Sequence, residues 1–446
     1  MSKKEKKIQD YDPAYSLLHR YVDFVIKHSY RHILHVDKEN IPKDGAIIFA
    51  PNHTNALMDA LVMLCIDRRP KVFVARADIF RNRRLARFLT FLKIMPIMRQ
   101  RDGFQAVKKN QEIINKSVDV LKDRIPFCIF PEGTHQAKYS SLPLSKGIFR
   151  IALQAHELMP DVPLYIVPVG LHYGDFFRYR STVRVQFGRP INVGQYLAEN
   201  DHLSPQEQTN GLKELLTERM HKTIFHLPND DDYPALLEVC HAVELWEKRC
   251  VLRRNRFSYF KLPDLEVQFW ANNATKEAFE ALRREAPEKA EELLELAREA
   301  EALRRGIGID ADSVKVGKPL KCRTKRVLFS LVTLPYILGS CVLASPLAGL
   351  CQFLFTKLKD PAFRNSLRFV MNLFVWPLLL LVYAILAFAF LPWMWAIAFV
   401  VLALPAPYVA HEGWKTVRLL VSDYKLLRTP RLMELYWHIR GMWFKI

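Results

Sequence analysis

A long apolar stretch near the end of the chain, residues 327–410, constrains the fold more than any other feature of the sequence. A helix needs about 20 apolar residues to cross a bilayer. The polar residues 356–368 divide the stretch into a first part, 327–355, that is too short for two spans, and a second part, 369–410, that is long enough for two. The sequence therefore predicts a membrane region that contains a transmembrane helical hairpin.

Clusters of Lys and Arg precede residue 327, interrupt the stretch at 356–368, and follow residue 410. Such clusters favour the cytoplasmic side of a membrane. All three clusters lie on the cytoplasmic side if 327–355 is re-entrant or interfacial and 369–410 is a hairpin. Three full spans would place one cluster on the other side of the membrane, so we rank that topology second. Residues 1–10 are not followed by the apolar core of a secretory signal, so we expect the soluble part of this membrane protein to face the cytoplasm.

The formal charge of +19 comes from 65 Lys and Arg against 46 Asp and Glu. A field of this size attracts polyanions, namely nucleic acid, anionic lipid or phosphorylated substrates. The apolar stretch favours anionic membrane lipid, and the sequence contains no aromatic and basic module that predicts a nucleic-acid partner. The seven cysteines show neither a C-x-x-C pair nor metal-ligand spacing, so we expect free thiols and no metal site.

Upstream of the apolar stretch, short apolar runs alternate with helical patterns. The strand-like runs are residues 46–50, 72–75, 126–130, 164–169 and 182–187, and the helical patterns are 104–122 and 145–158. This alternation is typical of an α/β domain with a parallel or mixed sheet flanked by helices. Residues 14–36 predict a further helix that lies on a bilayer or packs on the core.

Composition divides the chain into four predicted regions. These are a basic N-terminal region with a helix that could be interfacial (1–40), an α/β domain (41–230), a helical region (231–320) and the membrane region with a basic C-terminal tail (321–446). The polar break at 228–232 marks the end of the α/β domain. Residues 234–306 predict a solvated helical hairpin or coiled segment, and we assign no chemical role to them.

The sharpest motif joins a histidine to an aspartate across the start of a helix. His53 follows the strand at 46–50, and Asp59 lies six residues later. A histidine with a pKa near neutrality can accept the proton of an attacking hydroxyl, and a carboxylate can hold the imidazole in the required tautomer. A buried histidine at a strand end beside a solvated aspartate would produce the same spacing, so this pair alone is weak evidence.

A second motif, Phe-Pro-Glu-Gly-Thr-His at 130–135, follows the strand at 126–130 and places Glu132, Gly133 and Thr134 in a loop. Gly133 would allow a ligand to approach the backbone closely. Lys146 stands where the next helix begins, and both a cation and a helix N-terminus favour phosphate. An ordinary turn between strand and helix is the alternative.

Two further positions complete the set. Arg99 ends a short apolar strand, from which a guanidinium could bind phosphate with two hydrogen bonds; in a chain so rich in arginine, a surface residue is the alternative. Pro168 interrupts the apolar strand at 164–169, for which the alternative is a strand at the edge of a sheet.

In this order, the four motifs resemble the signature of the glycerophospholipid acyltransferase family: N-H-x4-D, an arginine block, F-P-E-G and an apolar V-P block. The resemblance covers residues 46–193. It implies an α/β acyltransferase domain in which His53 is the base and Asp59 its partner. It also implies that Arg99, Glu132 and Gly133 bind the acyl acceptor and that Pro168 shapes the site, with no metal or prosthetic group and with acyl-CoA or acyl-carrier protein as donor.

Finer features are similar to the subgroup that acts on glycerol 3-phosphate or dihydroxyacetone phosphate. They are His135 after the F-P-E-G motif, the run Leu-Pro-Leu-Ser-Lys-Gly at 142–147 and Tyr173 after the V-P block. We therefore expect acyl transfer to the sn-1 hydroxyl of glycerol 3-phosphate. The alternatives are acyl transfer to lysophosphatidate, giving phosphatidate, and a non-enzymatic lipid-binding membrane protein. Thr134 departs from the subgroup, which has a serine before the histidine.

Overall fold

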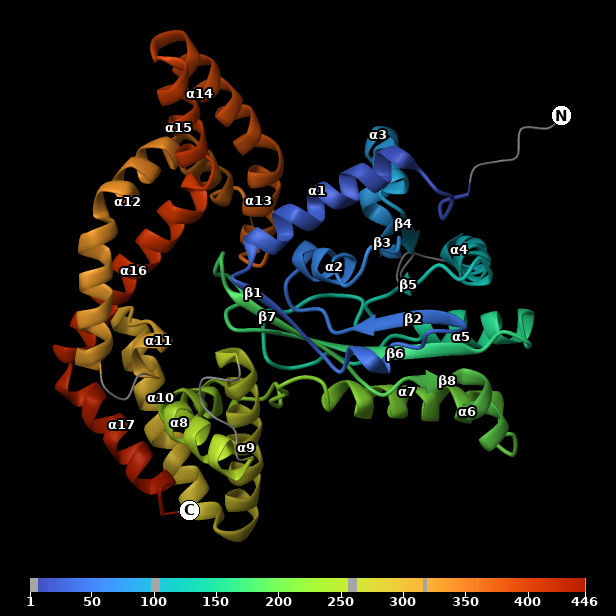
Figure 1. Cartoon of the computed structure of the whole chain (residues 1–446). Coiled ribbons are helices and arrows are strands. Elements are labelled where there is room, and N and C mark those ends of the chain that lie inside the picture. Colours follow the sequence, from blue (N-terminus) through green and yellow to red (C-terminus); the bar gives the residue numbers. More distant parts are fainter. Residues whose placement is uncertain (1–6, 98–104, 256–262, 316–318, 359, 446) are drawn as a thin grey trace. The chain divides into compact units, whose positions relative to one another are not determined.

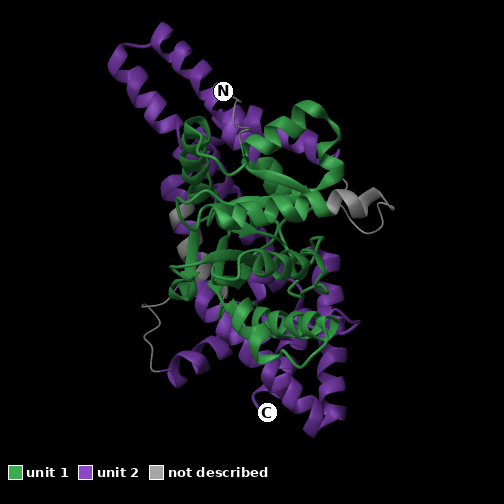
Figure 2. Ribbon diagram, turned by 90° about the vertical axis from the view of Figure 1, so that its right-hand side faces the viewer, with its two compact units in different colours: residues 1–224, 360–369 green, residues 225–359, 370–446 purple. Residues whose placement is uncertain are grey.

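The computed structural model describes residues 7–97, 105–255, 263–315, 319–358 and 360–445, and it divides them into two compact units. The first unit comprises residues up to Ile224 together with Asp360–Phe369, and the second comprises Phe225–Lys359 and Val370–Ile446. Figure 1 labels the helices and strands, and Figure 2 distinguishes the two units by colour. A short segment from far along the chain thus belongs to the first unit.

The first unit is built on one mixed sheet. Its strands are β1 (His32–Val36), β2 (Ala46–Pro51), β3 (Val72–Arg76), β4 (Ile94–Ile97), β5 (Phe127–Cys128), β6 (Leu164–Tyr173), β7 (Thr182–Phe187) and β8 (Ile191–Asn192). Their spatial order is β1-β7-β6-β2-β5-β3-β4, with β8 also paired to β6. Strand β6 pairs antiparallel with β7 and β8, and the other neighbours are parallel. The prediction of a mixed sheet is confirmed.

Helices flank this sheet in the first unit (Figure 1). They are α1 (Pro13–Ser29), α2 (Leu57–Leu64), α3 (Arg83–Phe91), α4 (Gln105–Lys122), α5 (Gly147–Leu158), α6 (Val193–Glu199) and α7 (Pro205–His221), with 3-10 turns η1 (Lys38–Asn40) and η2 (Ala77–Arg81). Alternate residues of β2, namely Ala46, Ile48 and Ala50, share one core cluster with apolar residues of α4, α5 and α7. This follows from the two-residue period of a strand, which sends every second side chain to the same face.

The prediction of one helix over residues 14–36 is wrong in its second half. Helix α1 ends at Ser29, and residues 32–36 form strand β1, which pairs in parallel with β7. The backbone turns at Tyr30, which has extended geometry, and the Arg31 N–H donates to the Ser181 carbonyl. Pairing with a distant strand decided this segment, which the local pattern could not show.

Strand β6 lies inside the sheet, so the alternative of an edge position for Pro168 is wrong. Pro168 is in register with Ala50 of β2. On its other side, β6 pairs with β8 before this position and with β7 after it. The missing N–H of Pro168 therefore coincides with the interval between two partner strands, where its carbonyl accepts a hydrogen bond from Gly188 N at 2.8 Å.

The second unit is helical. It contains α8 (Tyr233–Arg254), α9 (Asp264–Glu285), α10 (Pro287–Ile307), α11 (Ala311–Val314), α12 (Pro319–Phe355), α14 (Trp376–Phe390), α15 (Trp393–Ala403), α16 (Ala406–Leu427) and α17 (Pro430–Trp443), and a π-turn, η4 (Met371–Val375), precedes α14. Helix α13 (Phe363–Val370) begins in the first unit. Helices α8, α9 and α10 contact one another, so residues 234–306 are a packed three-helix group rather than a solvated hairpin.

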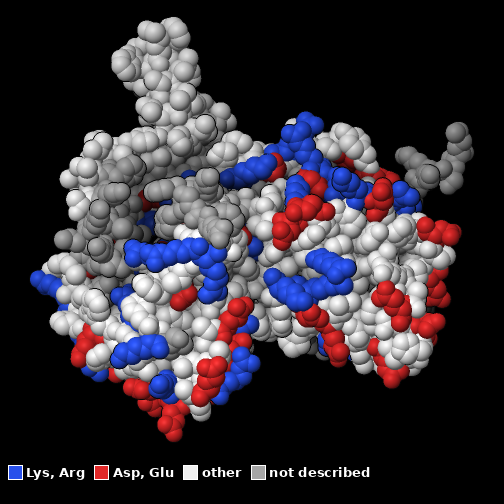
Figure 3. All heavy atoms as spheres, turned by 60° about the horizontal axis from the view of Figure 1, so that its bottom comes forward, with Lys and Arg blue, Asp and Glu red and all other residues white. Residues whose placement is uncertain are grey.

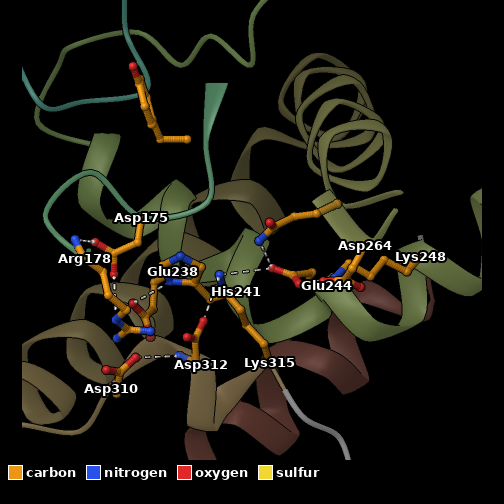
Figure 4. Close-up of polar contacts among 12 residues, drawn as sticks. Asp175, Arg178, Glu238, His241, Glu244, Lys248, Asp264, Asp310, Asp312 and Lys315 are labelled. Carbon is orange, nitrogen blue, oxygen red and sulfur yellow. Dashed lines mark hydrogen bonds and ion pairs between the residues drawn. The ribbon is translucent and has the colours of Figure 1, made fainter. Parts of the chain in front are cut away.

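Buried ion pairs connect the helices of this group (Figure 4). Arg304 donates two hydrogen bonds to Glu238, at 2.8 and 2.7 Å, and the hydroxyl of Tyr436 donates to the same carboxylate. Burial by itself raises the pKa of Glu238, but hydrogen bonds from His241 and Arg304 hold it well below the usual range. Lys248 forms a buried pair with Glu244 within α8 and also pairs with Asp264 of α9, whose side chain is exposed.

Two helices among the described residues are long and apolar enough to cross a membrane, Leu331–Phe355 and Phe363–Phe390. A third candidate is the pair α15 and α16, which is bent by 49°. Residues 327–355 thus form part of one continuous helix. This contradicts a re-entrant segment there, whereas the interfacial position that the sequence equally favoured stays a prediction. The bend falls instead in the second limb of the expected hairpin, at the Leu404-Pro405 step between α15 and α16.

Charged side chains of both signs are intermixed on the face of the molecule shown in Figure 3. Lys and Arg outnumber Asp and Glu in the whole chain, but on this face the basic side chains form small groups separated by acidic ones. The net charge therefore does not concentrate into one continuous basic surface on that side.

Candidate active site

Three neighbouring strands bring the predicted motifs to one edge of the sheet. Strand β2 pairs in parallel with both β5 and β6, so their carboxyl ends lie side by side. His53 follows β2, Glu132 follows β5, and Tyr173 ends β6. The carboxyl end of parallel strands is where open α/β sheets commonly bind ligands, and the segments that carry these residues are far apart in the sequence.

His53 and Asp59 are in direct contact. The Nδ1 atom of His53 lies 2.8 Å from Oδ2 of Asp59. The aspartate is fully buried, whereas the histidine side chain is 19% exposed. A carboxylate at Nδ1 selects the tautomer that carries its proton there and leaves Nε2 as the free base. The geometry agrees with the predicted pairing of these two residues.

The backbone and a tyrosine hold Asp59 in place. Its Oδ2 also accepts hydrogen bonds from Thr54 N at 2.8 Å and Asn55 N at 2.7 Å. The hydroxyl of Tyr173 donates to Oδ1 at 2.6 Å. Burial, together with the Asp59 charge, raises the pKa of Tyr173 well above its usual range, so this tyrosine remains a donor. Three donors besides His53 therefore fix the carboxylate that orients this histidine.

The turn between β2 and α2 is itself constrained. The side-chain amide of Asn52 donates to the Leu171 carbonyl at 3.1 Å and accepts from Leu171 N at 2.6 Å. Ala56 has φ 47° and ψ −128° immediately before α2, which is a conformation that costs a non-glycine residue energy. The strained turn directs the amides of Thr54 and Asn55 toward Asp59.

Glu132 is buried, at 7% exposure, and neither of its carboxylate oxygens has a hydrogen-bond partner among the described residues. Burial raises the pKa of Glu132 to about 8, and the Asp59 charge adds to the effect. Backbone donor groups of His53 and Leu142 lie near the carboxylate and offset part of the shift, although neither completes a hydrogen bond with it. The side chain is therefore largely neutral near pH 7, and its oxygens are available to a ligand.

The remaining loop positions are exposed. Gly133 has φ 68°, a left-handed value that glycine adopts without strain, and Thr134 and Lys146 are also exposed. The N–H of Ser145 donates to the Pro131 carbonyl at 2.7 Å. This bond ties the residue before Lys146 to the residue before Glu132, so the helix start and the loop lie together as expected.

The predicted positions are not all placed at the site. Arg99 lies outside the described residues. Pro168 lies inside β6, where it is in register with a residue of β2 that precedes His53. Sequence reasoning assigned no role to Asn52 or Tyr173, although both hold the turn. Asn52 stands beside His53 in the motif, which was an available signal, but Tyr173 reaches Asp59 only through strand pairing.

Two rings pack against the imidazole of His53. The Phe130 ring stacks on it with centroids 4.3 Å apart, and the His135 ring meets it edge-on at 5.4 Å. The arrangement provides a partly exposed base, oriented by a buried carboxylate, with a second imidazole beside it. Such a base can accept a proton from a hydroxyl group that approaches Nε2.

Comparison with known proteins identifies the class of this domain. The family model described as Acyltransferase matches residues 32–172, which include His53, Asp59, Glu132 and Pro168. The chain therefore carries an acyltransferase domain, as the motifs predicted.

Individual relatives agree with this class. The chain is 28% identical over 157 residues to "Glycerol-3-phosphate O-acyltransferase 2" of Saccharomyces cerevisiae, covering 35% of this chain and 21% of that protein. It is 38% identical over 88 residues to "Glycerol-3-phosphate O-acyltransferase 1" of the same yeast, covering 20% of this chain and 12% of that protein. The aligned parts thus span less than a quarter of the length of either yeast protein.

A bacterial relative is matched over more of its length. The "1-acyl-sn-glycerol-3-phosphate acyltransferase" of Bacillus subtilis is 24% identical over 184 residues, which cover 41% of this chain and 84% of that protein. Among solved structures, the 1-acyl-sn-glycerophosphate acyltransferase PlsC from Thermotoga maritima is similar at 20% identity, with a TM-score of 0.35 over 50% of this chain and 82% of that chain.

Proposed function

We propose that the protein transfers a fatty acyl group from a thioester donor to the sn-1 hydroxyl of glycerol 3-phosphate in phospholipid synthesis. The observation that carries the proposal is the contact of His53 Nδ1 with the buried Asp59, inside the segment that matches the acyltransferase family. This contact leaves the other ring nitrogen, Nε2, to act as the base in a side chain that is partly exposed.

The proposed reaction begins when the acceptor hydroxyl approaches Nε2 of His53. The hydroxyl oxygen attacks the thioester carbonyl as its proton passes to Nε2. The tetrahedral intermediate then collapses, the C–S bond breaks, and the thiol leaves with the proton from His53. Asp59 stays ionised and stabilises the transient imidazolium.

The acceptor would be bound by groups around the base. Glu132 is largely neutral near pH 7 and so does not repel a phosphate, and Lys146 offers a cation at the start of α5. We also propose that Arg99, Gly133 and Thr134 contribute contacts and that Pro168 shapes the site. The names of the two yeast relatives support glycerol 3-phosphate as acceptor.

A second acceptor is favoured by one specific observation. The Bacillus subtilis relative, 84% of whose length is covered, is named for acylation of 1-acyl-sn-glycerol 3-phosphate. The same base would then act on lysophosphatidate and produce phosphatidate. The chemistry at His53 is identical in the two cases, and a comparison of acceptors distinguishes them.

The donor and the setting of the reaction remain predictions. Acyl-CoA and acyl-carrier protein both supply the required thioester, and we expect no metal or prosthetic group to take part. The apolar helices support association with a membrane. We further propose that the catalytic domain faces the cytoplasm and that anionic lipid is a partner.

The test measures acyl transfer by the purified full chain in detergent. Palmitoyl-CoA and palmitoyl-carrier protein serve as donors, and glycerol 3-phosphate, dihydroxyacetone phosphate and lysophosphatidate as acceptors. His53→Ala is compared with His156→Ala, a control in α5. We expect product from glycerol 3-phosphate that His53→Ala abolishes and the control retains.

Other outcomes are equally clear. Product from lysophosphatidate alone would replace the acceptor and keep the chemistry. Full activity in His53→Ala would refute the assignment of the base. No product from any acceptor would favour the non-enzymatic lipid-binding protein.

A further inference from the structure

The segment Asp360–Phe369 belongs to the first unit, which contains the acyltransferase domain and is called the acyltransferase unit below. The residues on both sides of this segment belong to the second unit. The segment leads into the candidate span Phe363–Phe390, which has 28 residues where about 20 are needed to cross a bilayer. The first turns of that helix contain Arg364, Asn365 and Arg368 and are therefore not needed to cross the bilayer. Their polar side chains favour a position outside the lipid.

This segment contacts two loops of the acyltransferase unit. Asp360 Oδ2 lies 2.9 Å from Nε2 of His135, and the Phe363 ring meets the His135 ring edge-on with centroids 5.2 Å apart. The side-chain amide of Asn365 donates to the Phe176 carbonyl at 2.7 Å. The first two contacts reach the loop after Glu132, and the third reaches the loop that follows β6.

The carboxylate of Asp360 is oriented by its own chain. Its Oδ1 accepts a hydrogen bond from Ala362 N at 2.8 Å, and Pro361 follows it directly. An aspartate before a proline at the start of a helical turn is a common capping arrangement. One oxygen is thus held by the backbone, and the other is left for His135.

His135 is the second imidazole of the site. Its ring centroid lies 5.4 Å from that of His53, and its side chain is 19% exposed. Asp360 at Nε2 selects the tautomer with its proton on that atom and fixes the orientation of the ring. The two imidazoles are thereby each held by a carboxylate, one from the same turn and one from 225 residues away.

We infer that Asp360 is a positioning residue for the acyl-transfer reaction, which acts by holding His135 beside His53. The inference rests on the proposed function. It makes the stretch between the first two candidate spans part of the catalytic machinery rather than a passive connection. The role of Asp360 could not be predicted from the signature motifs, because these motifs end well before residue 360.

The experiment is a double-mutant cycle on the full chain in detergent, with Asp360→Asn, His135→Gln and the double variant. Asparagine can still cap Ala362, but its single carbonyl oxygen cannot serve both Ala362 and His135. Asp44→Asn, in the exposed loop before β2, is the matched control. For each variant, kcat and KM for the acceptor and the midpoint of thermal unfolding are measured.

We expect Asp360→Asn to lower kcat/KM about tenfold, because small misplacements of a site residue reduce rates by up to about a hundredfold. The same change made in the His135→Gln background should have no further effect. The unfolding midpoint of Asp360→Asn should stay within about 2 °C of the wild type because the cap is retained.

Three results would overturn the inference. One is an unchanged kcat/KM in Asp360→Asn, and another is an equal loss with and without His135, which would show that the two residues act separately. The third is a loss that parallels a large fall in the midpoint, which would indicate a structural role. A wild type that transfers no acyl group would refute the proposed function itself, and this inference with it.

Discussion

Glu132 offers the sharpest test of the electrostatics of the site, because its carboxyl group is buried without a hydrogen-bond partner among the described residues. Its pKa is raised by burial from 4.5 to about 8. Between these values the folded protein holds a proton that the unfolded chain has released. The contribution of Glu132 to the free energy of unfolding therefore falls as pH rises from about 4.5 to about 8, and this contribution is constant outside that interval.

The magnitude follows from the shift. Each unit of pKa difference corresponds to about 1.4 kcal/mol, so the wild type should lose about 3 kcal/mol of stability from this group between pH 5 and pH 7. Glu132→Gln removes the titration and with it this loss. For a domain of this size, 1 kcal/mol shifts the unfolding midpoint by roughly 2–4 °C.

The assay records thermal unfolding of wild type, Glu132→Gln and Glu214→Gln, an exposed control in α7, from pH 5 to pH 8.5. The midpoint of Glu132→Gln minus that of the wild type should rise by roughly 6–12 °C between pH 5 and pH 7. The control should follow the wild type. A constant difference between Glu132→Gln and the wild type would mean that the carboxylate is ionised and paired, which would refute the reasoning.

Three other substitutions test the site and the helical unit. Asp59→Asn should lower kcat by about a thousandfold or more in the acyl-transfer assay, because an amide favours the wrong tautomer of His53; a loss below tenfold would contradict this. Ala56→Gly should stabilise the protein by about 1 kcal/mol in thermal unfolding by relieving the positive φ, and a lower midpoint would argue against strain there. Arg304→Met should cost about 3 kcal/mol because it removes the guanidinium partner of the buried Glu238 and leaves that carboxylate with the Tyr436 hydroxyl and the His241 ring, and the double change with Glu238→Leu should recover most of that loss if the pairing is the cause.

Local signals in the sequence determined the class of the domain and much of its sheet. The alternation of apolar runs placed β2, β3 and β7 within a residue of their bounds, because a buried strand needs a continuous apolar run that few other structures need. The spacing of His53 and Asp59 predicted their contact because one turn of the chain brings the carboxylate back to the ring. Length and apolarity also located the membrane region, but they did not predict that residues 331–355 form a helix long enough to span.

Long-range contacts were decided by the tertiary structure alone. Strand β1 exists because β7 pairs with it, Tyr173 reaches Asp59 because β6 lies beside β2, and the pKa of Glu132 depends on burial that many segments produce together. Asp360 lies in a polar stretch whose sequence predicts only a connection between apolar segments, and folding of the chain brings it to His135. A sequence pattern records what neighbours in the chain require of one another, whereas burial and contacts across hundreds of residues are properties of the folded chain.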